Sequence, residues 1–154
     1  MKMRILLVLI ALGMVIHFIR GSTLWGMKTQ DMPTYSKALA DAKTHNKIIL
    51  ADFTGSDWCP YCVQLKQEVL DTVEFQKWAR YKFVFLELDF PRLIAQPDNI
   101  KKQNKALYSH FSVNGFPTVL LINGDGQELG RIVGYPGKDN WTQEVLDILA
   151  KQAH

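Results

Sequence analysis

The chain alternates between segments with helical spacing of apolar residues and short, continuous apolar runs. In residues 33–46 the apolar side chains recur three or four positions apart, which predicts an amphipathic helix. The runs 48–53, 83–89 and 118–122 are short, apolar and largely free of charge, and they predict strands buried at the centre of a sheet. Helix and strand therefore follow one another from the start of this region.

The remaining segments continue this alternation. They predict a helix from Cys59 through Trp78, an inserted loop at 90–102 that overlaps the start of a helix at 99–111, a hairpin turn at 123–126, a returning strand at 128–133 and a last helix around 141–149. The order is helix, strand, helix, strand, helix, strand, strand, helix. This order predicts an α/β fold in which helices cover both faces of a central mixed sheet.

The first 22 residues have the layout of a secretory signal. Two basic residues precede the apolar run Ile5–Ile16, and small residues follow it. The run is short for a membrane span, which needs about 20 apolar residues, but the small residues offer only a mediocre cleavage site. We expect a signal peptide or an N-terminal membrane anchor over 1–22, followed by one domain over 23–154. This domain is expected to work in the periplasm or otherwise outside the cytoplasm, soluble or anchored.

Length and charge narrow the function classes. With 154 residues and 47% hydrophobic content, the chain has material for one compact domain with its own core. The net charge of +3 comes from basic and acidic residues that are interspersed, so no basic stripe indicates a nucleic-acid partner. We expect a monomer that does not bind nucleic acid.

Cys59 and Cys62 are the two cysteines of the chain, and they stand between a predicted strand and a predicted helix. This spacing favours reversible dithiol chemistry over a structural disulfide that closes a long loop. Two thiolates could also hold Cu(I), so a copper-handling protein stays open as an alternative. Zinc would need two more ligands, and no histidine has a suitable spacing. We expect neither a metal nor another cofactor.

The position of Cys59 predicts its role. Only a thiolate attacks a disulfide, and a free cysteine, with a pKa of about 8.5, is mostly protonated at neutral pH. The start of a helix offers unpaired N–H groups and the positive end of the helix dipole, and both favour the charged sulfur. Cys59 is therefore the candidate nucleophile. Cys62, one helical turn further on, is the candidate resolving cysteine.

Several motifs together resemble the thioredoxin-like superfamily. Trp58–Cys62 is similar to the active-site turn of that family, Gly115–Thr118 to the loop that carries a cis-proline facing the cysteines, and Val133–Tyr135 to the end of its last strand. The segments Thr54–Cys59 and Asp89–Pro91 are similar to exported bacterial members, the chlamydial periplasmic oxidoreductases among them. The resemblance covers the whole domain and implies the three-layer thioredoxin-like fold.

The resemblance also implies an activity and a set of site residues. It implies a thiol-disulfide oxidoreductase, and we expect a disulfide reductase that exchanges electrons with protein disulfides or dithiols through a mixed disulfide. Asp52 is the candidate proton acceptor for Cys62; an aspartate hydrogen-bonded to backbone at the end of a strand is the alternative. The candidate substrate-binding residues are Trp58, Tyr61, Phe116, Pro117 (expected in the cis form) and Gly134.

Other interpretations remain open at this point. The Pro60–Tyr61 dipeptide between the cysteines is similar to glutaredoxins, so a glutathione-linked enzyme is the closest alternative, although no glutathione site is recognisable. Trp58 and Tyr61 could have only a packing role. Asp57 could approach the sulfur or could be a capping residue, and we prefer the second interpretation. The redox partner is not identified by any motif, and a membrane protein is one option.

Overall fold

The computed structural model describes residues 34–152. Its four strands form one sheet in the order β2, β1, β3, β4. Their bounds are β1 Ile48–Thr54, β2 Phe83–Asp89, β3 Thr118–Ile122 and β4 Glu128–Val133. β1 is parallel to β2 and antiparallel to β3, and β3 is antiparallel to β4. The sheet is therefore mixed, as predicted.

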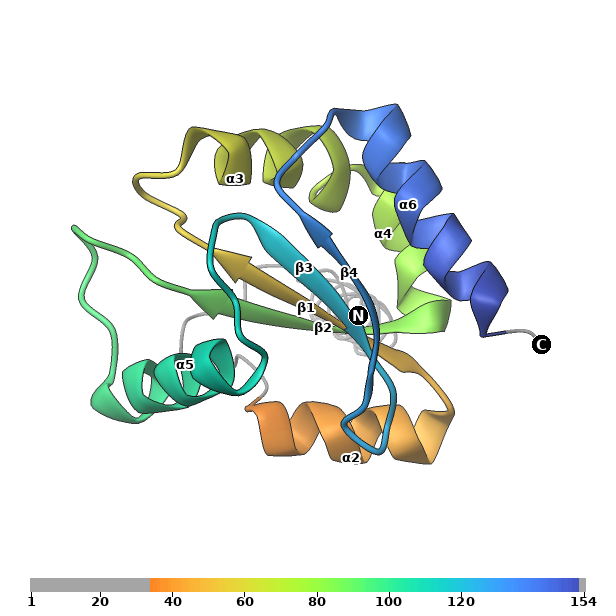
Figure 1. Ribbon diagram of the computed structural model, residues 1–154, viewed down its shortest axis with the longest axis horizontal. Coiled ribbons are helices and arrows are strands. Elements are labelled where there is room, and N and C mark those ends of the chain that lie inside the picture. Colours follow the sequence, from red (N-terminus) through yellow and green to blue (C-terminus); the bar gives the residue numbers. More distant parts are fainter. Residues whose placement is uncertain (1–33, 153–154) are drawn as a thin grey trace, which may run out of the picture. The chain divides into compact units, whose positions relative to one another are not determined.

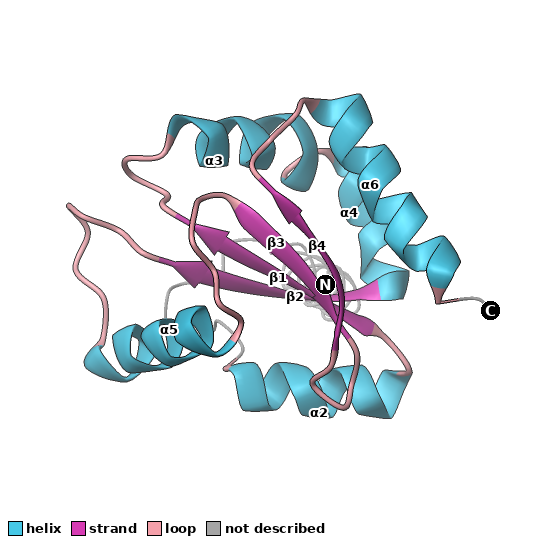
Figure 2. Ribbon diagram, in the orientation of Figure 1, coloured by secondary structure: helices cyan, strands magenta, loops and turns pink. Residues whose placement is uncertain are grey.

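Helices cover both faces of this sheet (Figures 1 and 2), which confirms the three-layer α/β fold class. α2 and α5 lie on one face, and α3, α4 and α6 lie on the other. The helical segments are α2 Tyr35–His45, α3 Pro60–Leu65, the π-helical turn η1 Lys66–Leu70, α4 Val73–Lys82, α5 Asp98–His110 and α6 Lys138–Lys151.

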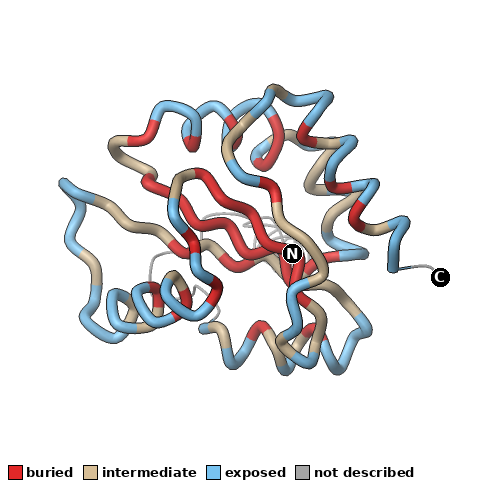
Figure 3. The backbone as a smooth tube through the Cα atoms, viewed as in Figure 1, coloured by how far each residue is buried: buried red, intermediate tan, exposed pale blue. Residues whose placement is uncertain are grey.

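The central strand β1 is buried on both faces, because successive side chains of a strand point to opposite sides. Ile49, Ala51 and Phe53 pack with residues of α2 and α5 in one core. Leu50 points to the other face and packs in a second core around Trp141 of α6. Figure 3 shows the buried backbone concentrated in the middle of the sheet. Asp52 lies two positions after Leu50 and therefore points to the same face of the sheet, which α3 covers.

The predicted helix from Cys59 through Trp78 is wrong in one respect, because it is not continuous. The chain leaves the helical conformation at Thr72, whose φ of −72° and ψ of 143° are extended. The Thr72 hydroxyl accepts a hydrogen bond from the Phe75 N–H at 3.4 Å and so caps a new helix, α4. Apolar periodicity continues across this break, whereas the helical hydrogen bonds do not.

The inserted segment is shorter than predicted. The loop runs from Phe90 to Pro97, and α5 already begins at Asp98, inside the range 90–102 that the prolines and polar residues had assigned to a loop. The predicted signal or anchor over 1–22 lies outside the described residues. Within residues 34–152, no helix is long and apolar enough to cross a membrane.

Candidate active site

Cys59 and Cys62 lie together at the N-terminus of α3 and are joined by a disulfide, with a Cα–Cα distance of 5.3 Å. Cys59 is the N-cap residue, and Pro60 occupies the first helical position, where its missing N–H leaves no hydrogen bond unmade. The Cys62 N–H donates to Cys59 Sγ at 3.3 Å, and the Gly55 N–H donates to Cys62 Sγ at 3.5 Å. Both sulfur atoms therefore accept backbone N–H donors.

A tight turn between β1 and α3 places the cysteines. The N–H groups of Trp58 and Cys59 both donate to the Gly55 carbonyl, at 3.2 Å and 2.9 Å. Gly55 packs directly against the Trp58 indole, since a Cβ at this position would lie 2.5 Å from the ring. The indole N–H donates to the Phe90 carbonyl at 2.8 Å. Trp58 is thus fixed between the turn and the loop that follows β2.

The loop that precedes β3 packs against the same tryptophan. The peptide bond between Phe116 and Pro117 is cis, the isomer that the resemblance implied. The Phe116 ring meets the Trp58 ring edge-on at a centroid distance of 5.6 Å. The Gly134 N–H donates to the Pro117 carbonyl at 2.8 Å, and Gly134 has a φ of +79°, which favours glycine. Four of the predicted substrate-binding residues are therefore connected; the fifth, Tyr61, is exposed in the first turn of α3.

Asp52 lies on the face of β1 that α3 covers, and it is buried. Its Oδ1 has no hydrogen-bond partner among the described residues, so the alternative of an aspartate tied to backbone does not hold for this oxygen. Burial, together with the negative charge of Glu87, raises the pKa of Asp52 from 3.8 to about 8. Asp52 is thus a carboxyl group that gains or loses its proton near the pH at which thiols do.

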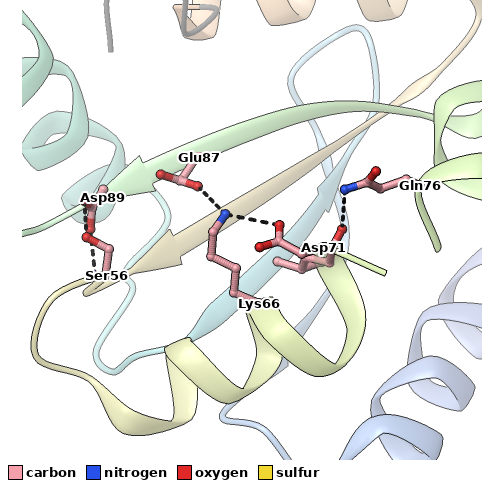
Figure 4. A network of polar contacts seen from close by, with 7 residues as sticks. Ser56, Lys66, Asp71, Gln76, Glu87 and Asp89 are labelled. Carbon is pink, nitrogen blue, oxygen red and sulfur yellow. Dashed lines mark hydrogen bonds and ion pairs between the residues drawn. The ribbon is translucent and has the colours of Figure 1, made fainter. Parts of the chain in front are cut away.

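Two charged residues accompany Asp52 that the motifs did not identify. Glu87 on β2 is the register partner of Asp52 on β1. Lys66 of η1 forms an ion pair with Glu87, with a distance of 3.5 Å between Lys66 Nζ and Glu87 Oε2 (Figure 4). Lys66 also lies 3.4 Å from Asp71 Oδ1. Burial raises the pKa of Glu87, while the positive charge of Lys66 opposes this shift. The lone acidic residue inside the apolar run 83–88 was the available signal for Glu87.

Sequence comparison identifies the family. A model of the thioredoxin-like domain family matches residues 35–149. The chain belongs to the thioredoxin-like domain family. Its CxxC pair, Cys59 and Cys62, is the feature that relates it to the disulfide oxidoreductases of this family.

Among its thioredoxin-like relatives are two proteins of Chlamydia pneumoniae. The chain is 35% identical over 104 residues to the disulfide bond reductase DsbH. This alignment covers 68% of this chain and 63% of DsbH. It is 37% identical over 98 residues to the thioredoxin-related protein DsbJ, covering 64% of this chain and 28% of DsbJ. The chain thus spans less than two thirds of the length of either relative. These matches confirm the resemblance to chlamydial oxidoreductases.

Solved thioredoxin-like structures give the same assignment. A structure of the DsbH oxidoreductase superposes with a TM-score of 0.71 at 29% identity and covers 84% of this chain and 94% of that one. A thioredoxin from Thermus thermophilus superposes with a TM-score of 0.60 at 24% identity over 77% of this chain and 85% of its own, and it supports the fold alone. Within residues 34–152 of this thioredoxin-like chain, no three His, Cys, Asp or Glu side chains could together hold a metal ion.

Proposed function

We propose that this protein is a thiol-disulfide oxidoreductase that reduces protein disulfides outside the cytoplasm. The observation that carries the proposal is the pair Cys59 and Cys62 at the start of α3, where each sulfur accepts a backbone N–H. Electron flow toward the substrate is supported by the relation to DsbH, which is a disulfide bond reductase. The basic and apolar N-terminal sequence supports export.

The reaction follows from the positions of the two sulfurs. In the reduced protein, the Cys59 thiolate attacks one sulfur of a substrate disulfide; a Cys59–substrate disulfide forms, and the other substrate sulfur leaves as a thiolate. The Cys62 thiolate then attacks Cys59 Sγ, which forms the internal disulfide and releases the second substrate thiolate. Two electrons pass to the substrate, whose sulfurs take up two protons. The helix N-terminus stabilises the Cys59 thiolate needed for the first attack.

The second attack requires that Cys62 lose its proton, and Asp52 is the proposed acceptor. Its pKa of about 8 lies close to that of a free thiol, about 8.5, so proton transfer between the two groups is nearly balanced. A carboxylate with an ordinary pKa near 4 would be a much weaker base for this step. Burial is the main cause of the raised pKa of Asp52; the charge of Glu87 raises it further and that of Lys66 lowers it. Because Glu87 and Lys66 act through Asp52, we regard them as positioning residues.

We propose that the substrate segment lies across Trp58, Phe116, Pro117 and Gly134. These residues come from three separate segments that meet beside Cys59, as the ring contact and the Gly134 to Pro117 hydrogen bond show. In this proposal the backbone of Phe116 pairs with an extended substrate polypeptide in the manner of an added strand. Exposed Tyr61 borders the same end of α3.

The proposal is tested by insulin reduction together with two cysteine variants. Cys59→Ser is expected to lose turnover, whereas Cys62→Ser should accumulate a mixed disulfide that mass spectrometry detects. Exposed Ser109→Ala on α5 serves as a control that should leave turnover unchanged. The redox potential measured against a glutathione series decides the direction: a strongly oxidising value would contradict a reductase. Full deglutathionylating activity of Cys62→Ser would instead favour the glutaredoxin-like alternative.

A further inference from the structure

The loop after β2 is fastened to the active-site turn by a carboxylate. Asp57, two residues before Cys59, accepts hydrogen bonds from the backbone N–H groups of Arg92 at 2.9 Å, Leu93 at 2.7 Å and Ile94 at 3.1 Å. These hydrogen bonds hold the pKa of Asp57 below its usual range, and the bond from the Arg92 N–H has the largest effect. Three successive N–H groups on one carboxylate define the course of a segment without secondary structure. Asp57 is therefore a capping residue of the loop.

Two further hydrogen-bonded contacts hold the same loop from its start. The Ser56 hydroxyl and N–H both donate to the Asp89 carboxylate, at 2.6 Å and 3.0 Å (Figure 4). Asn104 of α5, which is buried, donates its side-chain N–H to the Asp89 carbonyl at 2.8 Å. Figure 1 shows this loop projecting beyond the end of β2 next to the turn that precedes α3. The first part of the loop is thus held at two places, Asp89 and residues 92–94, next to the turn that carries the cysteines.

The part of the loop that Asp57 holds presents a cation and two apolar side chains. The Arg92 guanidinium lies over the Trp58 ring, with Cζ 3.8 Å from the ring centroid, and forms no ion pair with the described residues. Leu93 and Ile94 are 84% and 58% exposed. Both side chains thus leave most of their surface to solvent, although Asp57 holds the backbone that carries them. They are available to a partner, as is the positive charge.

We propose that residues 92–94 are a specificity element that binds the substrate polypeptide beside the disulfide being reduced, with an acidic side chain against Arg92 and an apolar one on Leu93 or Ile94. This inference rests on the proposed function. The occupant is the substrate because Arg92 stacks on Trp58, the neighbour of Cys59, so the segment continues the surface that the substrate must cross. The unpaired guanidinium adds charge complementarity for a carboxylate. Asp57 is the positioning residue of this element.

The test uses single-turnover reduction of designed peptides. The reduced protein is mixed with peptides that contain one intramolecular disulfide and have Glu-Leu, Lys-Leu or Glu-Ser beside a cysteine. Two electrons pass from the protein thiols to the peptide disulfide, so no other reductant is needed. Alkylation and mass spectrometry give each rate, which is divided by the rate with neutral bis(2-hydroxyethyl) disulfide. The Glu-Leu peptide is expected to react about two- to fivefold faster than Lys-Leu, which corresponds to about 0.5–1 kcal/mol.

Matched variants connect this preference to the loop. Arg92→Gln should abolish the preference for Glu-Leu over Lys-Leu, and Arg92→Glu should invert it. Arg80→Gln is the control, because Arg80 also lies over an aromatic ring, that of Tyr81 on α4. Leu93→Ser should lower the rate with Glu-Leu relative to Glu-Ser, while Leu146→Ser on α6 should not.

Asp57→Asn tests the positioning role. The variant should weaken both preferences, since an amide accepts the three N–H donors less strongly than a carboxylate. The exposed Asp147→Asn on α6 should keep both preferences.

Several outcomes would overturn the inference. Equal normalised rates for all peptides with the wild type, or an Arg92→Gln variant with an unchanged preference, would contradict it. Sedimentation that shows Leu93→Ser converting a dimer to a monomer, with peptide preferences intact, would assign the segment to a second copy of the chain instead. A wild type that does not reduce even bis(2-hydroxyethyl) disulfide would refute the proposed function itself, which is a distinct result.

Discussion

Replacing Asp52 with asparagine tests the electrostatic description of the site through protein stability. In the folded protein this carboxyl has a pKa of about 8, whereas in the unfolded chain its pKa is near 3.8. Between these two values the folded state keeps a proton that the unfolded state has lost. Raising the pH through this window therefore favours unfolding, and the stability of the oxidised wild type falls between about pH 4 and pH 8.

The magnitude follows from the same window. Each pH unit inside it carries about 1.4 kcal/mol, so at pH 7 the ionisable carboxyl lowers the free energy of unfolding by about 4 kcal/mol relative to a side chain that never ionises. Asp52→Asn keeps the shape of the side chain and removes the ionisation. The variant is thus expected to be more stable than the wild type by a few kcal/mol at pH 7, and the difference should shrink toward zero near pH 4.

Urea denaturation of the oxidised proteins at pH 4, 5, 6, 7 and 8 measures this difference directly, with equal m-values as the condition for comparing midpoints. The exposed Asp147→Asn serves as the matched control and should show no such pH-dependent gain. Because Glu87 also has a raised pKa, the decisive quantity is the difference between wild type and Asp52→Asn at each pH. A difference that stays constant from pH 5 to pH 8 would refute the assignment of a raised pKa to Asp52.

Three further variants test other contacts. Lys66→Met removes a positive charge that lowers the pKa of Asp52, so the pH window of that stability difference should extend upward, which the same urea series measures. Gly55→Ala places a Cβ against the Trp58 indole and should lower the free energy of unfolding by about 1–3 kcal/mol and slow insulin reduction; unchanged stability would contradict the close packing. Thr72→Ala should cost about 1 kcal/mol in thermal or urea unfolding, because it removes the cap of α4, and Thr72→Ser should restore most of it.

Much of the fold could be predicted from the sequence because it depends on local patterns. The run 48–53 is apolar at almost every position, and a short run of that kind is typical of a strand that is buried on both faces. The sequence Asn123–Gly126 formed the expected hairpin turn, in which the Gly126 N–H donates to the Asn123 carbonyl at 3.0 Å. The helix break at Thr72 was missed because the apolar spacing continues through it.

The candidate site also has features that the sequence predicted and features that it did not. The spacing of Cys59 and Cys62 and the adjacent helix start already predicted the redox pair, since neighbours within one turn are determined by the sequence itself. The cis peptide before Pro117 was expected from the family resemblance, because backbone propensity alone favours trans. A capping role for Asp57 was expected, but its partners and that of Glu87 could not be read from the motifs, since they lie more than 30 and 21 residues away.

The sequence by itself determined the order of elements, the apolar strands and the dithiol motif at a helix start. Only the tertiary structure decided that Asp52 is buried beside Glu87, with Lys66 as the nearby cation, and that Asp57 holds the loop at 92–94. The physical reason is that chain spacing specifies contacts within an element, whereas desolvation and Coulomb interactions depend on which elements pack together. In this protein those interactions come from β2, η1 and the loop before α5, which are far apart along the chain.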